Sequence, residues 1–443
     1  MENETDYRPA EDRMNELKAQ RRKRRARRRW SAVMTVLAIV LLTGAVILIL
    51  NDGASMLKGL LNDAPTASEN KTTQEANSGA EKYTTVTIAA VGDIGISDAL
   101  LADARSADGY DFSPSFFGAA SLLSDADLTV GNLECTLNGG SYGTAAANAP
   151  TVLADTLAGL GFDLLQTANS ASIMGGMAGL TATLDNLERS GIDPVGTFRS
   201  AEERSASGGV TIREVNGIRV AFIAFTKGLG NMSLPENSEY AVNLLYSDYD
   251  TNYRNLDTDA ISAAMEQAKK KDPDIIIALV HWGSEFSRDV SSSQKRVANL
   301  LYENGADAII GTHSHMVGPI ETQTITLENG TSKDVVTAYD LGDFYTDSTR
   351  AGTQLSLVLR LEFTHNNWTD QTTLTDLSYT PVYCADFGAS ARDRYQVLNV
   401  ANALELYRQE YVFRVDDETY ECLLDEMEAL PNHVHPPEAD EEE

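Results

Sequence analysis

From residue 83 onward, short apolar runs alternate with stretches in which apolar residues recur every three or four positions. The first pattern predicts buried strands and the second predicts amphipathic helices, and their alternation is typical of an α/β domain. We expect strands over residues 84–91, 127–130, 162–166, 211–215, 219–225, 274–280, 308–310, 335–339, 354–363 and 374–379. We expect helices over residues 154–160, 178–189, 259–270, 292–303, 401–411 and 419–429.

Residues 30–50 form an uncharged apolar segment, WSAVMTVLAIVLLTGAVILIL. In a helix its length matches a hydrocarbon core of about 30 Å. The apolar run continues past the small residues Gly44 and Ala45, whereas a cleavable signal peptide has a shorter apolar stretch that ends at its cleavage site. We therefore predict a retained transmembrane anchor.

A basic block, RRKRRARRR, directly precedes this segment. Positive charge is retained on the cytoplasmic side, so residues 1–29 are predicted to be a cytoplasmic segment and the main domain to lie outside a bacterial cell membrane. Nucleic-acid binding by the block is the weaker interpretation beside an uncharged span. Residues 51–82 are predicted to be a flexible linker, 83–430 one extracytoplasmic domain, and 431–443 an acidic tail. A separate small subdomain over residues 350–430 remains an alternative.

Charge and cysteine content limit the choice of partners. The chain has 35 Lys and Arg against 65 Asp and Glu, a formal charge of −30, and the part after residue 50 alone carries −35. A body this acidic argues against nucleic acid as the main partner. Three cysteines, Cys135, Cys384 and Cys422, allow one disulfide at most and fit a cysteine-poor exported bacterial protein.

Polar side chains follow five of the predicted strands, at the point where each strand ends. The carboxyl ends of strands in α/β sheets converge on one edge, where sites form. Carboxylates and imidazoles together are ligands for a divalent metal such as Zn, Mn or Fe. The most specific signal is His313-x-His315, while His433-x-His435 in the tail and His365 in a predicted surface turn are interpreted as lacking such a role. The candidate ligands are Asp93, Glu134, His281, His313 and His315.

Six ordered motifs resemble the CapA family of bacterial capsule, or poly-γ-glutamate, synthesis proteins with a metallophosphatase-like fold. They are VGDIGIS, GNLECTL, TANSASIMGGMAGLTATLDNLERSGI, LVHWGSEF, GADAIIGTHSHMVGPIE and AYDLGDFYTD, within about residues 85–348. The resemblance implies a membrane-tethered extracytoplasmic domain with a calcineurin-like sandwich of two sheets flanked by helices. It implies a role in the synthesis, export or attachment of an anionic cell-envelope polymer, with the membrane and the polymer or its synthesis and export proteins as partners.

The resemblance also assigns roles to individual residues. Asp93 would be a terminal metal ligand, Glu134 a bridging acid, and His281, His313 and His315 the imidazole ligands. The supporting residues would be Asn132, Asn169, Trp282, Glu285 and Asp343, with Trp282 shaping the pocket floor.

The chain departs from the family pattern at its Asn-Asn-His-x-x-Asp-x-Gly stretch. Here Ser170 replaces the second Asn, Ala171 the His and Met174 the Asp. In phosphoesterases that Asn is a metal ligand and that His helps to bind or protonate the leaving group, so a ligand and the general acid are lost. Gly95 also stands where many phosphoesterases carry His, and Asp343 is an extra carboxylate that either replaces a ligand or is an ordinary loop residue.

Two alternatives follow for the site. One is an active metal-dependent hydrolase of phosphoester or amide-like bonds, and the other is a non-catalytic scaffold of an envelope synthesis complex. An acidic exterior domain would also repel a polyanion unless divalent cations or a basic patch intervene, or unless the polymer is of another kind.

Overall fold

A computed structural model describes residues 82–326, 330, 332–408 and 415–436. The predicted cytoplasmic segment and the predicted anchor at residues 30–50 lie outside these residues. Among the described helices, none combines the length and apolar character needed to span a bilayer. The described residues all belong to one compact unit.

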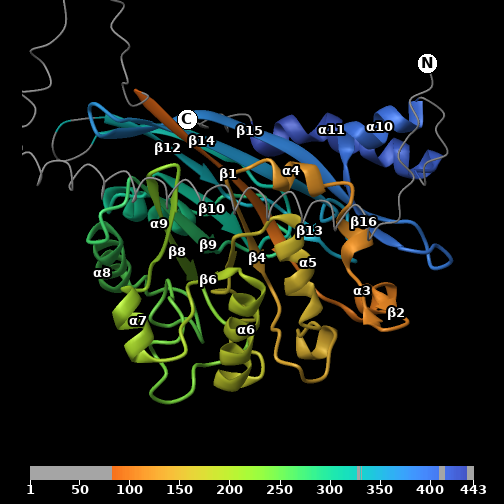
Figure 1. The fold of residues 1–443 in the computed structure, drawn as a ribbon, viewed down its shortest axis with the longest axis horizontal. Helices are drawn as coiled ribbons and strands as arrows, with labels where there is room; N and C mark the ends of the chain where they lie inside the picture. Colours follow the sequence, from red (N-terminus) through yellow and green to blue (C-terminus); the bar gives the residue numbers. More distant parts are fainter. Residues whose placement is uncertain (1–81, 327–329, 331, 409–414, 437–443) are drawn as a thin grey trace, which may run out of the picture. The chain divides into compact units, whose positions relative to one another are not determined.

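Two β-sheets form the centre of this unit (Figure 1). The first sheet has the order β16 (Tyr395–Asn399), β15 (Gln371–Asp386), β14 (Leu355–Asn366), β1 (Tyr83–Ile94), β4 (Leu128–Leu133), β5 (Leu164–Gln166) and β6 (Asp193–Val195), and β13 (Asp343–Tyr345) pairs with the end of β1. The second has the order β11 (Ile320–Thr326), β12 (Ser332–Ala338), β10 (Ala308–Thr312), β9 (Ile275–His281), β8 (Ile218–Thr226) and β7 (Thr211–Val215). Two short strands, β2 (Arg105–Ser106) and β3 (Gly109–Tyr110), pair with each other and form a separate two-stranded sheet.

The core explains why the central strands read as nearly continuous apolar runs. On β9, Ile275, Ile277 and Leu279 join a core with Val86 and Ile88 of the other sheet. The alternate residues of β9 join a second core with helices α8 (Thr258–Lys269) and α9 (Ser292–Glu303). Both faces of β9 are therefore buried, as is usual for parallel strands covered by another layer on each side. The structure confirms an α/β sandwich of two sheets.

Of the remaining helices, the sequence pattern predicted four, near residues 154–160, 178–189, 401–411 and 419–429. It missed the three short helices at residues 98–103, 120–124 and 201–207. The remaining helices are α3 (Asp98–Asp103), α4 (Ala120–Ser124), α5 (Val152–Leu160), α6 (Gly176–Ser190), α7 (Ala201–Ser207), α10 (Val400–Arg408) and α11 (Asp417–Val434), with 3-10 turns at Ser113–Phe116 and Thr144–Ala146. Helix α9 begins in a capping box of Ser291 and Gln294 and has Asn304 as its C-cap, where a helix end was expected. Buried residues of α10 and α11 belong to the same core as β15 and β16, so residues 350–430 do not form a separate subdomain.

Two expectations differ from the structure, and the cysteines settle a third point. Helix α11 continues to Val434, which is completely buried, so residues 431–434 are helical and are not part of a tail. His365 is not in a surface turn: it lies on β14, is 9% exposed, and its Nδ1 is 2.9 Å from Thr372 Oγ1. All three cysteines are free thiols, so no bridge forms.

Candidate metal centre

The ends of β1, β4, β9, β10 and β13 bring the predicted ligands together. In the first sheet Asp93 lies opposite Asn132 on one side and Asp343 on the other, both in parallel strands. In the second sheet His281 at the end of β9 lies opposite Thr312, which directly precedes His313. Parallel pairing aligns the carboxyl ends of β1 and β4 in the first sheet and of β9 and β10 in the second, as the sequence predicted, whereas Asp343 is the first residue of β13.

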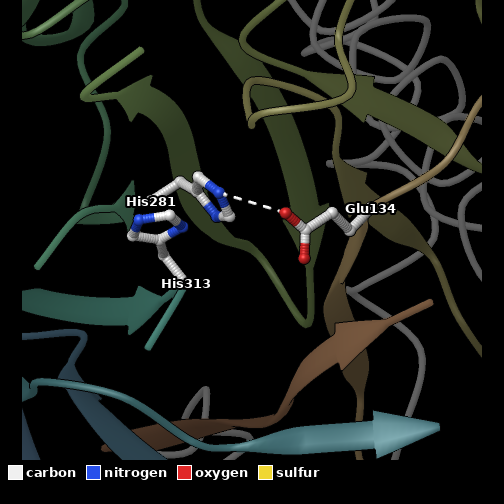
Figure 2. Close-up of side chains that lie close together, drawn as sticks. All are labelled: Glu134, His281 and His313. Atoms are coloured by element: carbon white, nitrogen blue, oxygen red, sulfur yellow. Dashed lines mark ion pairs between the residues drawn. The ribbon is translucent and has the colours of Figure 1, made fainter. Parts of the chain in front are cut away.

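Glu134, His281 and His313 form one group, and Figure 2 shows their side chains turned toward one another. Their candidate ligand atoms all lie within 4.8 Å of each other. His281 Nε2 is 3.4 Å from Glu134 Oε1, and the two imidazole centroids are 4.5 Å apart. His281 Nε2 and His313 Nδ1 are buried and have no hydrogen-bond partner. Because unpartnered buried nitrogens are costly, they point to a missing ligand.

Asp93, His315 and Asp343 form a second group with the same compactness. His315 Nδ1 is 2.8 Å from Asp343 Oδ1 and 3.6 Å from Asp93 Oδ2. The main-chain N–H of His313 donates to Asp93 Oδ2 over 3.2 Å, which connects this group to the first. The two groups are thus neighbours that share the short segment carrying both histidines.

Two asparagines hold these groups in register. Asn132 Nδ2 donates to Asp93 Oδ1 over 2.5 Å and lies 3.4 Å from His281 Nδ1. Asn169 Nδ2 donates in turn to Asn132 Oδ1 over 2.9 Å and to the carbonyl of Leu133 over 2.8 Å. Asn132 and Asn169, both predicted as supporting residues, therefore form a relay of amides that orients Asp93.

The segment carrying the histidines has an unusual backbone. His313 has φ of 104° and His315 has φ of 62°, which are sterically disfavoured for residues with a Cβ. Asp340 holds the segment in place: it accepts from the N–H of Ser314 over 2.6 Å and from that of Gly342 over 2.7 Å. Strain kept at a cluster of buried polar groups is typical of a functional site. Asp340 was missed as a site residue, although a lone acid directly after a buried strand and before Leu-Gly was the available signal.

Ser170 and Ala171 stand where the resemblance predicts Asn and His, and they make hydrogen bonds within the site without supplying an imidazole. The hydroxyl of Ser170 donates to Glu134 Oε1. Ala171 is 6% exposed and contributes its main-chain N–H to Asn169 Oδ1 over 3.0 Å. Where the resemblance predicts an imidazole, Ala171 presents a methyl group, which cannot donate a proton to a leaving group.

Two predicted supporting residues lie elsewhere. Trp282 packs in the outer core of the second sheet, where it stacks on Tyr339 and donates from Nε1 to the Tyr339 carbonyl over 2.9 Å. It does not shape the floor of the site, because it points to the face of the sheet opposite His281. Glu285 is exposed and belongs to neither group; its charge acts on Lys227.

Burial and close charges set the protonation of the site. Burial alone would raise the pKa of Glu134, but His281, His315 and the Ser170 hydroxyl lower it to about 2. Burial, with His281 and Lys227, lowers the pKa of His313 to about 2. Burial alone would lower the pKa of His315, but Asp343 and Asp93 raise it to about 11. Burial raises the pKa of Asp343 to about 7. At neutral pH Glu134 is therefore ionised and His313 is neutral, while the second group holds a proton on His315.

These pKa values predict how the metal-free protein responds to pH. Folded Asp343 and His315 retain protons that the unfolded chain releases, so their contribution to the free energy of unfolding should fall as pH rises. Glu134 and His313 have lowered pKa values and contribute in the opposite direction, but only below about pH 6.5. The fall begins above about pH 3.8 and continues through about 7 for Asp343, and runs from about 6.5 to about 11 for His315. We expect His315→Gln to flatten the fall above about pH 7 in urea denaturation of chelator-treated protein. Equal slopes for wild type and His315→Gln would contradict this electrostatic picture.

Comparison with known proteins identifies the family. The family model of the bacterial capsule synthesis protein PGA_cap matches residues 87–348, which include both groups of candidate ligands. The chain belongs to this family. The predicted membership of the CapA family of capsule synthesis proteins is confirmed, and a capsule-related function is supported.

Two curated relatives agree with the assignment. The PGA biosynthesis protein CapA of Bacillus subtilis is 28% identical over 207 residues, which cover 47% of this chain and 48% of the relative. The capsule biosynthesis protein CapA of Bacillus anthracis is 23% identical over 209 residues, covering 46% of this chain and 45% of the relative. The chain thus spans about half the length of the curated relatives it matches.

Solved structures show only a distant likeness. A putative 5'-nucleotidase from Staphylococcus aureus has a TM-score of 0.42 and 15% identity, covering 70% of this chain and 57% of that chain. A novel phosphatase from Mycoplasma pneumoniae has a TM-score of 0.38 and 13% identity, covering 68% of this chain and 94% of that chain. Nothing about the function of this protein is inferred from them.

Proposed function

We propose that this protein is a membrane-anchored component of the machinery that synthesises, exports or attaches an anionic cell-envelope polymer of the poly-γ-glutamate type. Its family membership over residues 87–348 carries this proposal. The apolar segment at residues 30–50 and the basic block before it support an anchor with a cytoplasmic N-terminus. The two-sheet domain would then work on the outer side of a bacterial membrane.

We also infer that the domain is of the metallophosphoesterase type and holds a divalent metal such as Zn, Mn or Fe. The orphaned nitrogens of His281 and His313, next to an ionised Glu134, fit the requirement for neutral imidazole and carboxylate ligands. Asp93, His315 and Asp343 would supply the ligands of an adjoining position. Thr312 Oγ1 lies 3.1 Å from His281 Nδ1, and this contact would orient the ring so that the other nitrogen, Nε2, binds the metal.

A bound metal would also reduce the repulsion between this acidic protein and an anionic polymer. The chain carries a net charge of −30, which repels a polyanion. A divalent ion at this edge of the sandwich would present positive charge at one place and would polarise a bound carboxylate, carbonyl or phosphoryl oxygen. The polymer would then be attracted to this edge of the domain, while the rest of the acidic surface disfavours non-specific contact.

A second candidate is an active metal-dependent hydrolase of phosphoester or amide-like bonds. The preformed pair of ligand groups favours it. The methyl group of Ala171 in place of an imidazole favours instead a site that binds without cleaving, as expected of a scaffold in an envelope synthesis complex. Both versions keep the metal centre and differ in whether the bound polymer is cut.

Deletion and complementation in the bacterium that carries this gene test the proposed role. We expect deletion to remove most of the cell-associated anionic polymer, measured as glutamate released by acid hydrolysis of washed envelopes. Wild type and the control His365→Ala should restore it, whereas Glu134→Gln should restore about a tenth or less, because it removes the ionised ligand of the first group. Unchanged polymer after deletion would refute the proposed role, and full restoration by Glu134→Gln would show that the site is not used.

A further inference from the structure

A cavity of about 360 Å³ lies between the loops after β8 and the helices α7 and α8. None of the candidate metal ligands lines it. Its walls combine apolar and aromatic side chains, among them Phe225, Leu244 and Tyr246, with polar and charged ones that include Asp257. A concave, mainly apolar cavity with a few polar groups is the usual form of a small-molecule site.

Asn243 is the feature that points to a ligand. The residue is 2% exposed, yet neither its Oδ1 nor its Nδ2 has a hydrogen-bond partner. Its backbone is held firmly, because its N–H donates to the Gly196 carbonyl over 3.1 Å and its carbonyl accepts from Thr226 over 3.0 Å. A buried amide with a free donor and a free acceptor is destabilising unless something pairs with both.

Arg204 adds a cation to the same cavity. Its guanidinium donates to the carbonyls of Glu239 and Tyr240 over 3.3 and 3.2 Å and lies 5.6 Å from the ring centroid of Phe198. Burial lowers the pKa of Arg204, and within the described part of the chain it forms no ion pair with an acidic side chain. A guanidinium held by carbonyls and lacking a carboxylate partner is suited to bind a carboxylate from a ligand.

We propose that this cavity binds a small ligand with an amide next to a carboxylate, the amide paired with Asn243 and the carboxylate with Arg204. An amide offers one acceptor and one donor, which complements the two free atoms of Asn243. Glu236 and Glu239 also line the cavity and are exposed, so they oppose the passage of a polyanion and favour a single acyl amino acid unit. This proposal does not depend on the function proposed for the metal centre.

The cavity is connected to the metal centre through one strand. Thr226 at the end of β8 bonds with Asn243 through the backbone and lies opposite His281 on β9. Lys227, the next residue, donates its N–H to the carbonyl of His281 over 2.8 Å. A ligand bound at Asn243 would therefore lie beside the end of β8, and β8 pairs directly with the strand that carries His281.

The test is calorimetric titration of the full-length protein with N-acetylalanine and with γ-glutamylglutamate. We expect saturable binding of at least one, with a Kd of about 0.1–1 mM. The tighter of the two identifies a free acyl amino acid or a polymer fragment as the source of the ligand. N-acetylalanine methyl ester lacks the carboxylate and valerate lacks the amide, so each should bind about tenfold more weakly or not at all. Absence of saturable binding up to about 10 mM for both probes would overturn the proposal.

Two variants separate recognition from stability. Asn243→Leu should abolish binding and raise the melting temperature of the free protein, because it removes two unpartnered buried atoms. Arg204→Met should weaken binding about tenfold or more, whereas the control Arg219→Met, which also removes contacts to main-chain carbonyls, should leave it unchanged. Retained binding in Asn243→Leu, or a lower melting temperature, would show that Asn243 serves the fold and would overturn the assignment.

Discussion

Replacing His281 with Ala is expected to remove the metal from the first ligand group and to lower its affinity by about 100-fold or more. His281 is completely buried at the end of β9, and its unpartnered Nε2 is 3.4 Å from Glu134 Oε1. No other described side chain replaces it in that group. Metal content of the purified full-length protein, measured by mass spectrometry after loading with Zn or Mn and desalting, gives the comparison with wild type.

The matched control is His365→Ala. His365 is also buried and lies on β14, where it forms a third group of possible ligands with Asp274 and Asp370, although Asp370 is exposed. It belongs to neither of the two groups at the strand-end site. It should retain the wild-type metal content. If His281→Ala bound as much metal as wild type while keeping its fold, the first group would not be a metal site.

Replacing Gly92 with Ala is expected to destabilise the domain by about 3 kcal/mol and to disrupt the second ligand group. A Cβ at position 92 would lie 1.8 Å from the carbonyl oxygen of Gly342, a main-chain atom that accepts from the N–H of Asp93. The two strands β1 and β13 must then separate, which moves Asp93 away from Asp343. Thermal unfolding of the chelator-treated protein and metal titration measure the two effects.

Gly95→Ala is the control for this substitution. Three residues further along the chain, a Cβ would lie 3.5 Å from the carbonyl of Tyr345, an ordinary van der Waals contact. Gly95→Ala should therefore change stability by about 0.5 kcal/mol or less. Equal stability of Gly92→Ala and wild type would mean that β1 and β13 are not in the close contact described here.

The sequence was sufficient to predict that the candidate ligands lie close together, while their role as metal ligands stays a prediction. Asp93, Glu134, His281, His313 and His315 lie at or just after the carboxyl end of a strand, and parallel strands deliver their carboxyl ends to one edge regardless of side-chain detail. Local apolar patterning was enough to locate those strands. The same patterning predicted an α/β domain, whereas the sandwich of two sheets was implied only by the family resemblance.

What remained hidden depends on geometry between distant segments. The division into two ligand groups follows from the register that places Asp343 beside Asp93, which a single sequence does not reveal. Asp340 acts through hydrogen bonds to a loop 26 residues away in the chain. The wrong placement of Trp282 has a simple cause: adjacent residues at a strand end face opposite sides, so it could not share the pocket with His281.

The most direct test of the metal centre is anomalous X-ray diffraction from crystals of the full-length protein loaded with Zn or Mn. The account predicts an anomalous peak among Glu134 Oε1, His281 Nε2 and His313 Nδ1, with ligand distances of about 2.0–2.2 Å. A second peak beside Asp93, His315 and Asp343 would show that both groups are occupied. A fully loaded crystal without a peak at either group, with the three side chains arranged as in Figure 2, would contradict it.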